Sequence, residues 1–193
     1  MSLPILTLDE HLLSPSFGYV FHRHWLAPFE SIVGMLWKFA HMNRLPGHTV
    51  VTRLCRDPID PYEGIALAEI DVVLVARLLG VTQRRVRAGI GRVSAGTSKS
   101  VRFCPRCLTL AYHAVLHQLE RFGRCPIHGI PLQAACHGCT RTSQYRLDAQ
   151  LLDAPFRCRH CRRYYTSSGT APCFRHAALS LKNRMAITRA VLS

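Results

Sequence analysis

Four short motifs determine how this chain folds: CPRC at residues 104–107, CPIH at 125–128, CHGC at 136–139 and CRHC at 158–161. Each motif places two metal ligands three positions apart, so that a tight turn presents both to one side of a metal ion. A structural zinc ion takes four such ligands in a tetrahedron. The four motifs therefore predict two zinc ions per chain, with the ligands Cys104, Cys107, Cys125, His128, Cys136, Cys139, Cys158 and Cys161.

Two arrangements of the motifs around the metal ions are open. Consecutive pairing joins the first motif with the second and the third with the fourth, whereas a cross-braced arrangement joins alternate motifs. The spacers of the consecutive arrangement are nearly equal and close to the length seen in zinc ribbons, which favours it. His137 and His160 lie inside motifs and are alternative ligands, although Cys-x-x-Cys has the better geometry.

A disulfide framework is the other use for nine cysteines. The first residues, MSLPILTLDEHLL, lack a basic n-region and a clear small-residue cleavage site, so nothing in them predicts an oxidising compartment. No apolar run approaches the length of a membrane span. We therefore expect a zinc protein of the reducing cytoplasm without a membrane partner. Cys55 and Cys173 stand outside the motifs, and we expect Cys55 to be a small buried apolar residue.

The charge of the chain indicates a polyanionic partner. The formal net charge is +14 over 193 residues, with only 11 acidic side chains. No Asp or Glu occurs from Val72 to Leu119, a stretch that contains many arginines. Such a basic stretch is typical of nucleic-acid binding. The candidate contacts in and beside it are Arg77, Gln83, Arg84, Arg85, Arg87, Arg92 and Lys99.

The segment VVLVARLLGVTQRRVRAGI at 72–90 has the pattern of a helix-turn-helix. Ala76 supplies a small residue at the helix crossing, Gly80 fits a left-handed turn, and Val86 holds the second helix. Thr82 is suited to cap that second helix. The alternative is a helical hairpin that packs on the zinc region or on a partner protein, with its arginines merely solvated.

Apolar periodicity predicts further helices. We expect one from residue 30 to a stop at residues 45–47, with Trp37 in the core, and a second over 64–79. The segment 47–63 is expected to be a connection and 91–100 a hinge. A short helix is expected between the first two motifs, over 110–119, and His113 and His117 are assigned to its surface or to packing. A closing helix is expected over 174–192.

The predicted fold is mainly α with small zinc-ribbon or knuckle β elements. A helical domain that contains the helix-turn-helix should occupy residues 1–98, a tandem zinc-finger domain 99–170, and a C-terminal helix 171–193. An enzyme is not expected. Four protein ligands close each zinc site, and the chain has neither the His-x-Glu of nucleobase deaminases nor a phosphate-binding GxxxxGK[ST] loop.

The zinc motifs resemble those of the TniQ/TnsD family of transposon target-selection proteins. The resemblance is carried by FCPRC, CPIHGIPL, CHGC and CRHC within residues 102–165, and CPIHGIPL is its most specific part. The segment Glu30–Asn43 is similar to the first helix of the family, and 72–90 falls where members carry a helix-turn-helix. His117-Gln118 stands where family members commonly have Trp-Gln. The length is similar to that of the short TniQ type.

The resemblance implies a non-enzymatic adaptor in bacterial DNA transposition. Such a protein links a target marker, either DNA or a CRISPR RNA-guided effector complex, to an AAA+ ATPase transposition regulator. A homodimer is open as well as a monomer. A second hypothesis is a sequence-specific, zinc-stabilised helix-turn-helix DNA-binding regulator. A third, a RING-like ligase module, requires the cross-braced arrangement.

Overall fold

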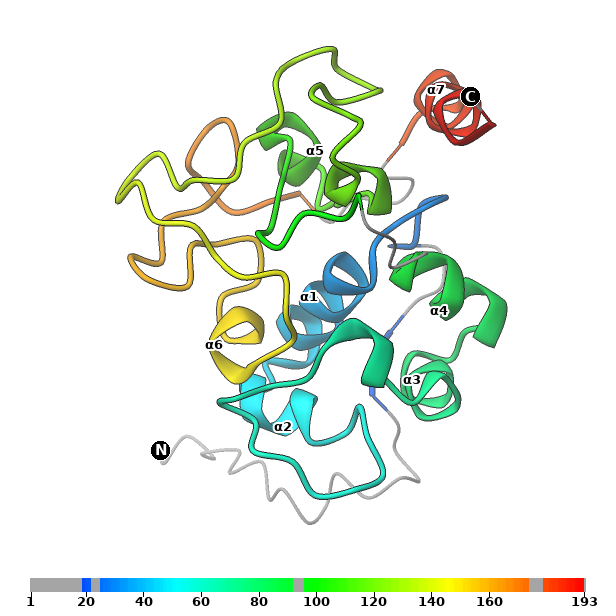
Figure 1. Cartoon of the computed structure of the whole chain (residues 1–193), viewed down its shortest axis with the longest axis vertical. Coiled ribbons are helices and arrows are strands. Elements are labelled where there is room, and N and C mark those ends of the chain that lie inside the picture. Colours follow the sequence, from blue (N-terminus) through cyan, green and yellow to red (C-terminus); the bar gives the residue numbers. More distant parts are fainter. Residues whose placement is uncertain (1–18, 22–24, 92–95, 174–178, 193) are drawn as a thin grey trace, which may run out of the picture.

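The computed structural model describes residues 19–21, 25–91, 96–173 and 179–192. Within these ranges the chain is mainly helical, and no segment reaches the length of a strand. Pairing between segments is limited to isolated antiparallel bridges, most of them within residues 97–164, a region that Figure 1 draws mainly as loops. The helices are α1 Ile32–Asn43, α2 Gly47–Val51, η3 Leu67–Glu69, α3 Val72–Leu79, α4 Gln83–Ile90, α5 Pro105–Thr109, η4 Val115–Gln118, α6 Ala149–Leu152 and α7 Leu181–Leu192.

Helix α1 lies at the centre of the molecule in Figure 1 and is buried from Ile32 to Ala40. Ser31 caps its N-terminus by accepting a hydrogen bond from Gly34 N, and Arg44 ends it in the left-handed conformation, with φ 50°. Trp37 is fully buried, and its Nε1 donates to Leu151 O at 2.9 Å. The predicted helix and the predicted core position of Trp37 are thus confirmed.

Helix α2 replaces part of the connection that the sequence predicted over 47–63. Gly47 begins this helix and donates its N–H to Asp153 Oδ1 at 2.5 Å. A Cβ atom at Gly47 would lie 2.0 Å from Ala149 O, so only glycine allows α2 and α6 to approach this closely. Pro46 and Gly47 thus follow the end of α1, as the sequence predicted. They also begin α2, which the sequence analysis did not predict.

Helix α3 begins at Val72 and not near Gly64, so the prediction of one helix over 64–79 was wrong. Ile65 instead forms an antiparallel bridge with Leu147. Asp71 caps α3 by accepting hydrogen bonds from the amides of residues 73 and 74. The apolar residues that precede α3, Ile65, Leu67 and Ile70, are buried in the larger hydrophobic cluster but do not lie on one face of a continuous helix.

Helices α3 and α4 form a pair joined by a tight turn. Gly80 ends α3 with φ 61°, and Thr82 caps α4 by accepting from Arg85 N at 3.3 Å. On the face of α4 that packs against α1, a Cβ atom at Gly89 would lie 2.9 Å from Glu30 O. The absence of a side chain there lets α4 lie directly against the start of α1.

The helix expected over 110–119 is not continuous. Helix α5 begins inside the first motif and ends at Thr109, and Ala111 then adopts φ 51° in the left-handed region. Only residues 115–118 form a further 3₁₀ turn, η4. The apolar residues of this segment are spaced as on a helix, but they pack as an irregular, buried loop.

The larger hydrophobic cluster joins residues from both sides of position 98. It contains Leu36 and Trp37 of α1 together with Phe103, Phe156 and Tyr165 of the metal-binding half. The domain boundary at 98 stays a prediction, but the two halves share this core. In the closing segment, the described helix runs from Leu181, while residues 174–178 lie outside the described residues. No helix in the described ranges is long and apolar enough to span a membrane.

We predict that Ser31→Ala lowers the free energy of unfolding by about 2 kcal/mol, because it removes both a helix cap and the buried partner of His113. Thr82→Ala is the matched control: it removes an exposed cap and should cost only about 0.5–1 kcal/mol. Urea unfolding of the metal-loaded chain, followed by circular dichroism, measures both values. Equal losses of unfolding free energy in the two variants would contradict the double role of Ser31 as helix cap and partner of His113.

Candidate metal centres

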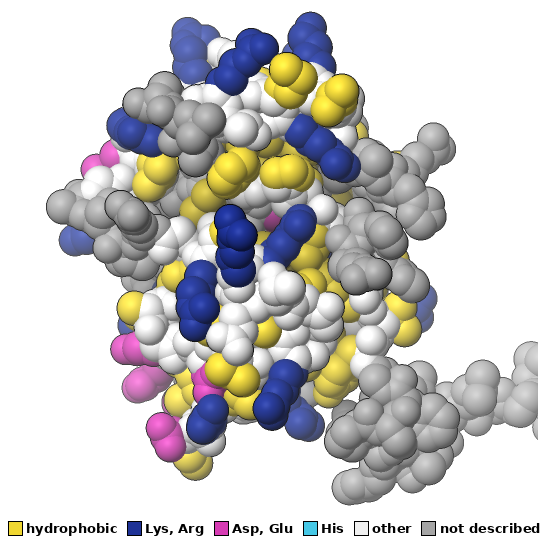
Figure 2. Space-filling model, turned by 90° about the vertical axis from the view of Figure 1, so that its right-hand side faces the viewer, with side chains coloured by type: hydrophobic (Ala, Val, Ile, Leu, Met, Phe, Trp, Pro, Cys, Tyr) yellow, Lys and Arg dark blue, Asp and Glu magenta, His cyan; other side chains and the backbone are white. Residues whose placement is uncertain are grey.

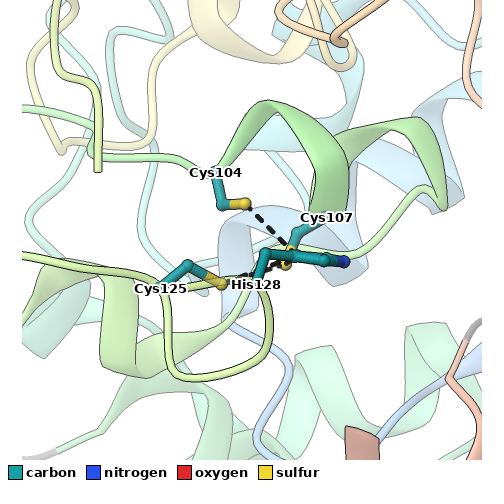
Figure 3. A group of neighbouring side chains, drawn as sticks. All are labelled: Cys104, Cys107, Cys125 and His128. Carbon is teal, nitrogen blue, oxygen red and sulfur yellow. Dashed lines mark hydrogen bonds between the residues drawn. The ribbon is translucent and has the colours of Figure 1, made fainter. Parts of the chain in front are cut away.

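The first group of metal-binding side chains comprises Cys104, Cys107, Cys125 and His128. Cys104 precedes the first turn of α5 and Cys107 lies within it, while the other two come from the loop after η4. Figure 3 shows the four side chains converging on one point. Their donor atoms all lie within 4.8 Å of one another.

The separations within this group fit a tetrahedral ion. Cys107 Sγ lies 3.6 Å from Cys125 Sγ, and His128 Nδ1 lies 3.4 Å from Cys104 Sγ and 3.3 Å from Cys107 Sγ. A tetrahedral zinc ion with bonds of about 2.3 Å to sulfur and about 2.0 Å to nitrogen has edges of roughly 3.5–3.8 Å. The four donor atoms therefore surround a space of the right size for one metal ion.

His117 supports this group from outside. Its Nδ1 accepts a hydrogen bond from Ala114 N at 3.3 Å, so the ring proton is on Nε2. Nε2 lies 3.8 Å from Cys125 Sγ and can donate to it. A donor to a ligating sulfur stabilises the thiolate and orients the ligand. The sequence placed His117 only on a surface or in packing, because its partner in the turn at 125 could not be identified from spacing.

His113 is a structural link between this module and α1. Its Nε2 donates to Arg102 O at 2.8 Å, and its Nδ1 accepts from the hydroxyl of Ser31 at 2.5 Å. Burial lowers the pKa of His113 to about 3, so the ring is neutral, as this pair of hydrogen bonds requires. The assignment of His113 to packing fits this position.

The second group comprises Cys136, Cys139, Cys158 and Cys161, whose sulfurs also lie within 4.8 Å of one another. The Sγ atoms of Cys136 and Cys161 are 3.6 Å apart, as are those of Cys139 and Cys158. Although burial opposes ionisation, the amides of Cys161 and His160 lower the pKa of the Cys158 thiol to about 6. A thiol that ionises readily is suited to bind a metal ion.

Three of the four motifs share one turn geometry. In each, the residue four positions after the first ligand has a positive φ: 66° at Gly129, 60° at Thr140 and 62° at Arg162. The N–H of that residue donates to the carbonyl of the first ligand at 2.7–2.9 Å. In the second group, backbone N–H groups also point at sulfur: Gly138 N lies 3.3 Å from Cys136 Sγ, and His160 N 3.4 Å from Cys158 Sγ. These turns direct both side chains of a motif to the same side.

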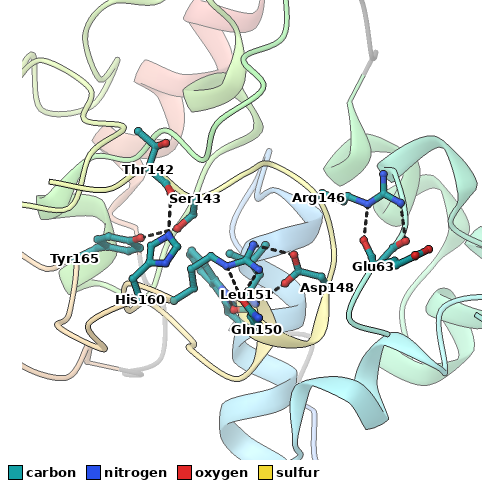
Figure 4. Close-up of polar contacts among 12 residues, drawn as sticks. Glu63, Thr142, Ser143, Arg146, Asp148, Gln150, Leu151, His160 and Tyr165 are labelled. Carbon is teal, nitrogen blue, oxygen red and sulfur yellow. Dashed lines mark hydrogen bonds and ion pairs between the residues drawn. The ribbon is translucent and has the colours of Figure 1, made fainter. Parts of the chain in front are cut away.

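Polar contacts fix the second group to the body of the chain (Figure 4). Arg159 donates to Asp148 Oδ2 at 2.8 Å and to Gln150 Oε1, while Asp148 also caps α6. His160 Nε2 lies 3.1 Å from Thr142 O and is therefore used as a donor. Neither His160 nor His137 belongs to the group of four, so the Cys-x-x-Cys ligands are the ones brought together.

The structure pairs the motifs consecutively, and the cross-braced alternative is excluded. All nine cysteines are free of disulfides. Cys55 and Cys173 belong to neither group; Cys55 is half-buried, with Sγ 3.5 Å from Glu69 O, and Cys173 is exposed. The two groups can thus hold two metal ions per chain.

The predicted nucleic-acid contacts differ in their surroundings. Arg77, Gln83, Arg84, Arg87 and Lys99 are exposed, and Arg87 donates to Gln83 Oε1 at 3.1 Å. Arg92 lies outside the described residues. Arg85 is half-buried and donates to Ala27 O at 3.0 Å, so it attaches α4 to the segment before α1.

Figure 2 shows the side of the molecule on which α3, α4 and α7 lie. Lys and Arg side chains are spread over this face, whereas Asp and Glu lie mainly near its lower left edge. Positively charged side chains therefore outnumber negatively charged ones on this face.

We predict that Cys107→Ser removes one of two bound metal ions per chain and lowers the melting temperature, because Cys107 supplies one of the four donor atoms of its group. Cys173→Ser is the matched control and should retain both ions, since Cys173 is outside the groups. Elemental analysis and thermal unfolding measure these effects. If Cys107→Ser stays fully loaded, the first group is not a metal site.

Comparison with models of known protein families finds none that matches this chain. A search of curated proteins likewise finds no match. The two groups of ligands, the basic face and the resemblance of the cysteine motifs are therefore the basis for a functional assignment.

Proposed function

We propose that both groups hold structural zinc. Three thiolates with one imidazole, and four thiolates, are donor sets that zinc prefers in closed tetrahedral sites. Each group already supplies four protein donor atoms, so no coordination position is left for water or substrate. Zinc bound in this way stabilises the fold and does not catalyse a reaction. This favours a non-enzymatic binding protein.

We infer that α3 and α4 are a helix-turn-helix whose second helix contacts nucleic acid. The left-handed Gly80, the cap at Thr82 and the buried Val86 are the features that this motif requires. Gln83, Arg84 and Arg87 are exposed on α4 and suit contacts to phosphates and base edges. Arg85 has a structural role in this proposal and is not a nucleic-acid contact.

On this basis we propose an adaptor in DNA transposition that links a target marker to an AAA+ ATPase regulator. The marker is DNA or a CRISPR RNA-guided effector complex. The observation that carries the proposal is the consecutive pairing of the motifs, in which CPIHGIPL supplies Cys125 and His128 to one closed group. Together with α1 and the α3–α4 pair, this gives the order of elements that the TniQ/TnsD resemblance implies.

A sequence-specific DNA-binding regulator is the second candidate. It is favoured by one observation, the exposed Gln83 beside Arg84 and Arg87, because glutamine and arginine can read base edges. A regulator should keep a large preference for its site as salt rises. An adaptor that depends on other proteins for its target should bind DNA weakly, with a steep dependence on salt.

We predict that Arg84→Ala combined with Arg87→Ala weakens binding to duplex DNA and reduces the slope of log K against log salt by about 2, one for each lost phosphate contact. The matched control, Arg53→Ala with Arg141→Ala, removes the same charge from exposed positions outside α4 and should change both values less. Fluorescence anisotropy with a labelled duplex at several salt concentrations measures the slopes.

The same variants separate DNA binding from the adaptor role. Both double variants should co-purify with an AAA+ ATPase transposition regulator, if that ATPase binds elsewhere than α4. Equal DNA binding by the two double variants would show that the arginines of α4 are merely solvated and do not contact DNA. Failure of the unchanged, zinc-loaded chain to bind the ATPase would contradict the adaptor proposal and favour the regulator.

A further inference from the structure

The two metal centres differ in how far their sulfur ligands are exposed. In the first, Cys104, Cys107 and Cys125 are at most 1% exposed. In the second, Cys139 is half-buried and Cys161 is exposed. The cysteine ligands of the second centre are therefore more accessible to small oxidants in solution than those of the first.

The exposed Cys161 has a neighbouring cysteine with which it can form a disulfide. Cys161 Sγ lies 3.6 Å from Cys136 Sγ, and a disulfide requires the two atoms to approach to about 2.0 Å. In the first centre, Cys107 and Cys125 are separated by the same 3.6 Å, but both are buried. Access to solvent, and not the distance between sulfurs, is thus what distinguishes the two centres.

The exposed ligand also lies outside the hydrophobic packing that holds its partners. Cys136 and Cys158 belong to the larger hydrophobic cluster, which includes the stacked rings of Phe103 and Tyr165, 4.3 Å apart. Cys161 is not part of either cluster. Its sulfur can therefore leave the metal without opening the core.

We propose that the second centre is an oxidation-sensitive site at which a hydroperoxide joins Cys161 to Cys136 and expels the zinc ion, while the first centre keeps its own. The Cys161 thiolate attacks one peroxide oxygen, the O–O bond breaks, and the hydroxide that leaves takes up a proton. The Cys136 thiolate then attacks the resulting sulfenic sulfur, and a second hydroxide leaves and is protonated. Two thiolates, one hydrogen peroxide and two protons give one disulfide and two waters.

Zinc leaves because only two of its ligands, Cys139 and Cys158, still carry a thiolate. The loops around the second centre then lose the ion that holds them together, whereas α5 and the first centre stay attached to α1. This inference rests on the proposal that the bound metal is zinc. Oxidation would thus loosen one module of the chain without unfolding the other.

The test treats the zinc-loaded full chain with hydrogen peroxide in the presence of a chromogenic zinc chelator. We expect one of the two zinc ions to be released roughly ten times faster than the other, because thiolate exposure controls the rate. Alkylation followed by peptide mass spectrometry should find a Cys136–Cys161 disulfide while Cys104, Cys107 and Cys125 stay reduced.

Two variants sharpen this test. Cys161→His keeps a zinc ligand at this position but removes the reactive sulfur. Zinc should therefore stay bound, and the fast release of one zinc ion should disappear. Cys173→Ser removes an exposed cysteine that is no ligand, and fast release should be unchanged. Release of both ions at one rate, or oxidation of the first centre before the second, would overturn this inference alone. A chain purified without zinc would contradict the zinc assignment as well.

Discussion

The convergence of two distant turns on one group of four potential metal ligands is the constraint on which the rest of this structure depends. Residues 97–173 contain only short helices and isolated bridges, so hydrogen-bonded secondary structure cannot hold them in place. Each group of four ligands instead joins two turns that are separated along the chain. A metal bound to preformed turns contributes free energy that this part of the chain lacks in secondary structure.

The position of α4 depends on the first centre through a short series of contacts. The segment Ala27–Ser31 lies between them. On one side Ser31 N donates to His113 O at 2.7 Å, and Tyr112 Oη donates to Pro28 O at 2.8 Å. On the other side Arg85 donates to Ala27 O at 3.0 Å. The metal module and the basic helix are therefore attached to the same piece of backbone.

A buried ion pair fixes that piece of backbone to α1. Glu30 Oε1 lies 2.6 Å from Lys38 Nζ, and both side chains are at most 1% exposed. Burial raises the pKa of Glu30, while Lys38 and the hydrogen bond from Ala27 N oppose this rise. An unpaired charge at this depth is costly, so the pair specifies one arrangement of the segment. The sequence did not predict this pair, because Glu30 and Lys38 are eight residues apart and not at the three- or four-residue spacing of a local helical ion pair.

The sequence predicted the elements that depend on local chemistry. The ligands followed from motif spacing, and α1 followed from its apolar periodicity and its stop at residues 45–47. Prediction failed where burial came from distant contacts: Ile65 is buried through its bridge to Leu147, and the apolar spacing of 110–119 is interrupted by the left-handed Ala111. The cap at Asp71 was a local signal that could have placed the start of α3 correctly.

We propose that two closed groups each hold one zinc ion through protein ligands alone. X-ray absorption at the zinc edge of the purified chain tests it most directly. We expect an average first shell of seven sulfur atoms and one nitrogen atom over two ions, with zinc–sulfur distances of about 2.3 Å. A shell dominated by oxygen or nitrogen, or one that includes a bound water, would contradict it.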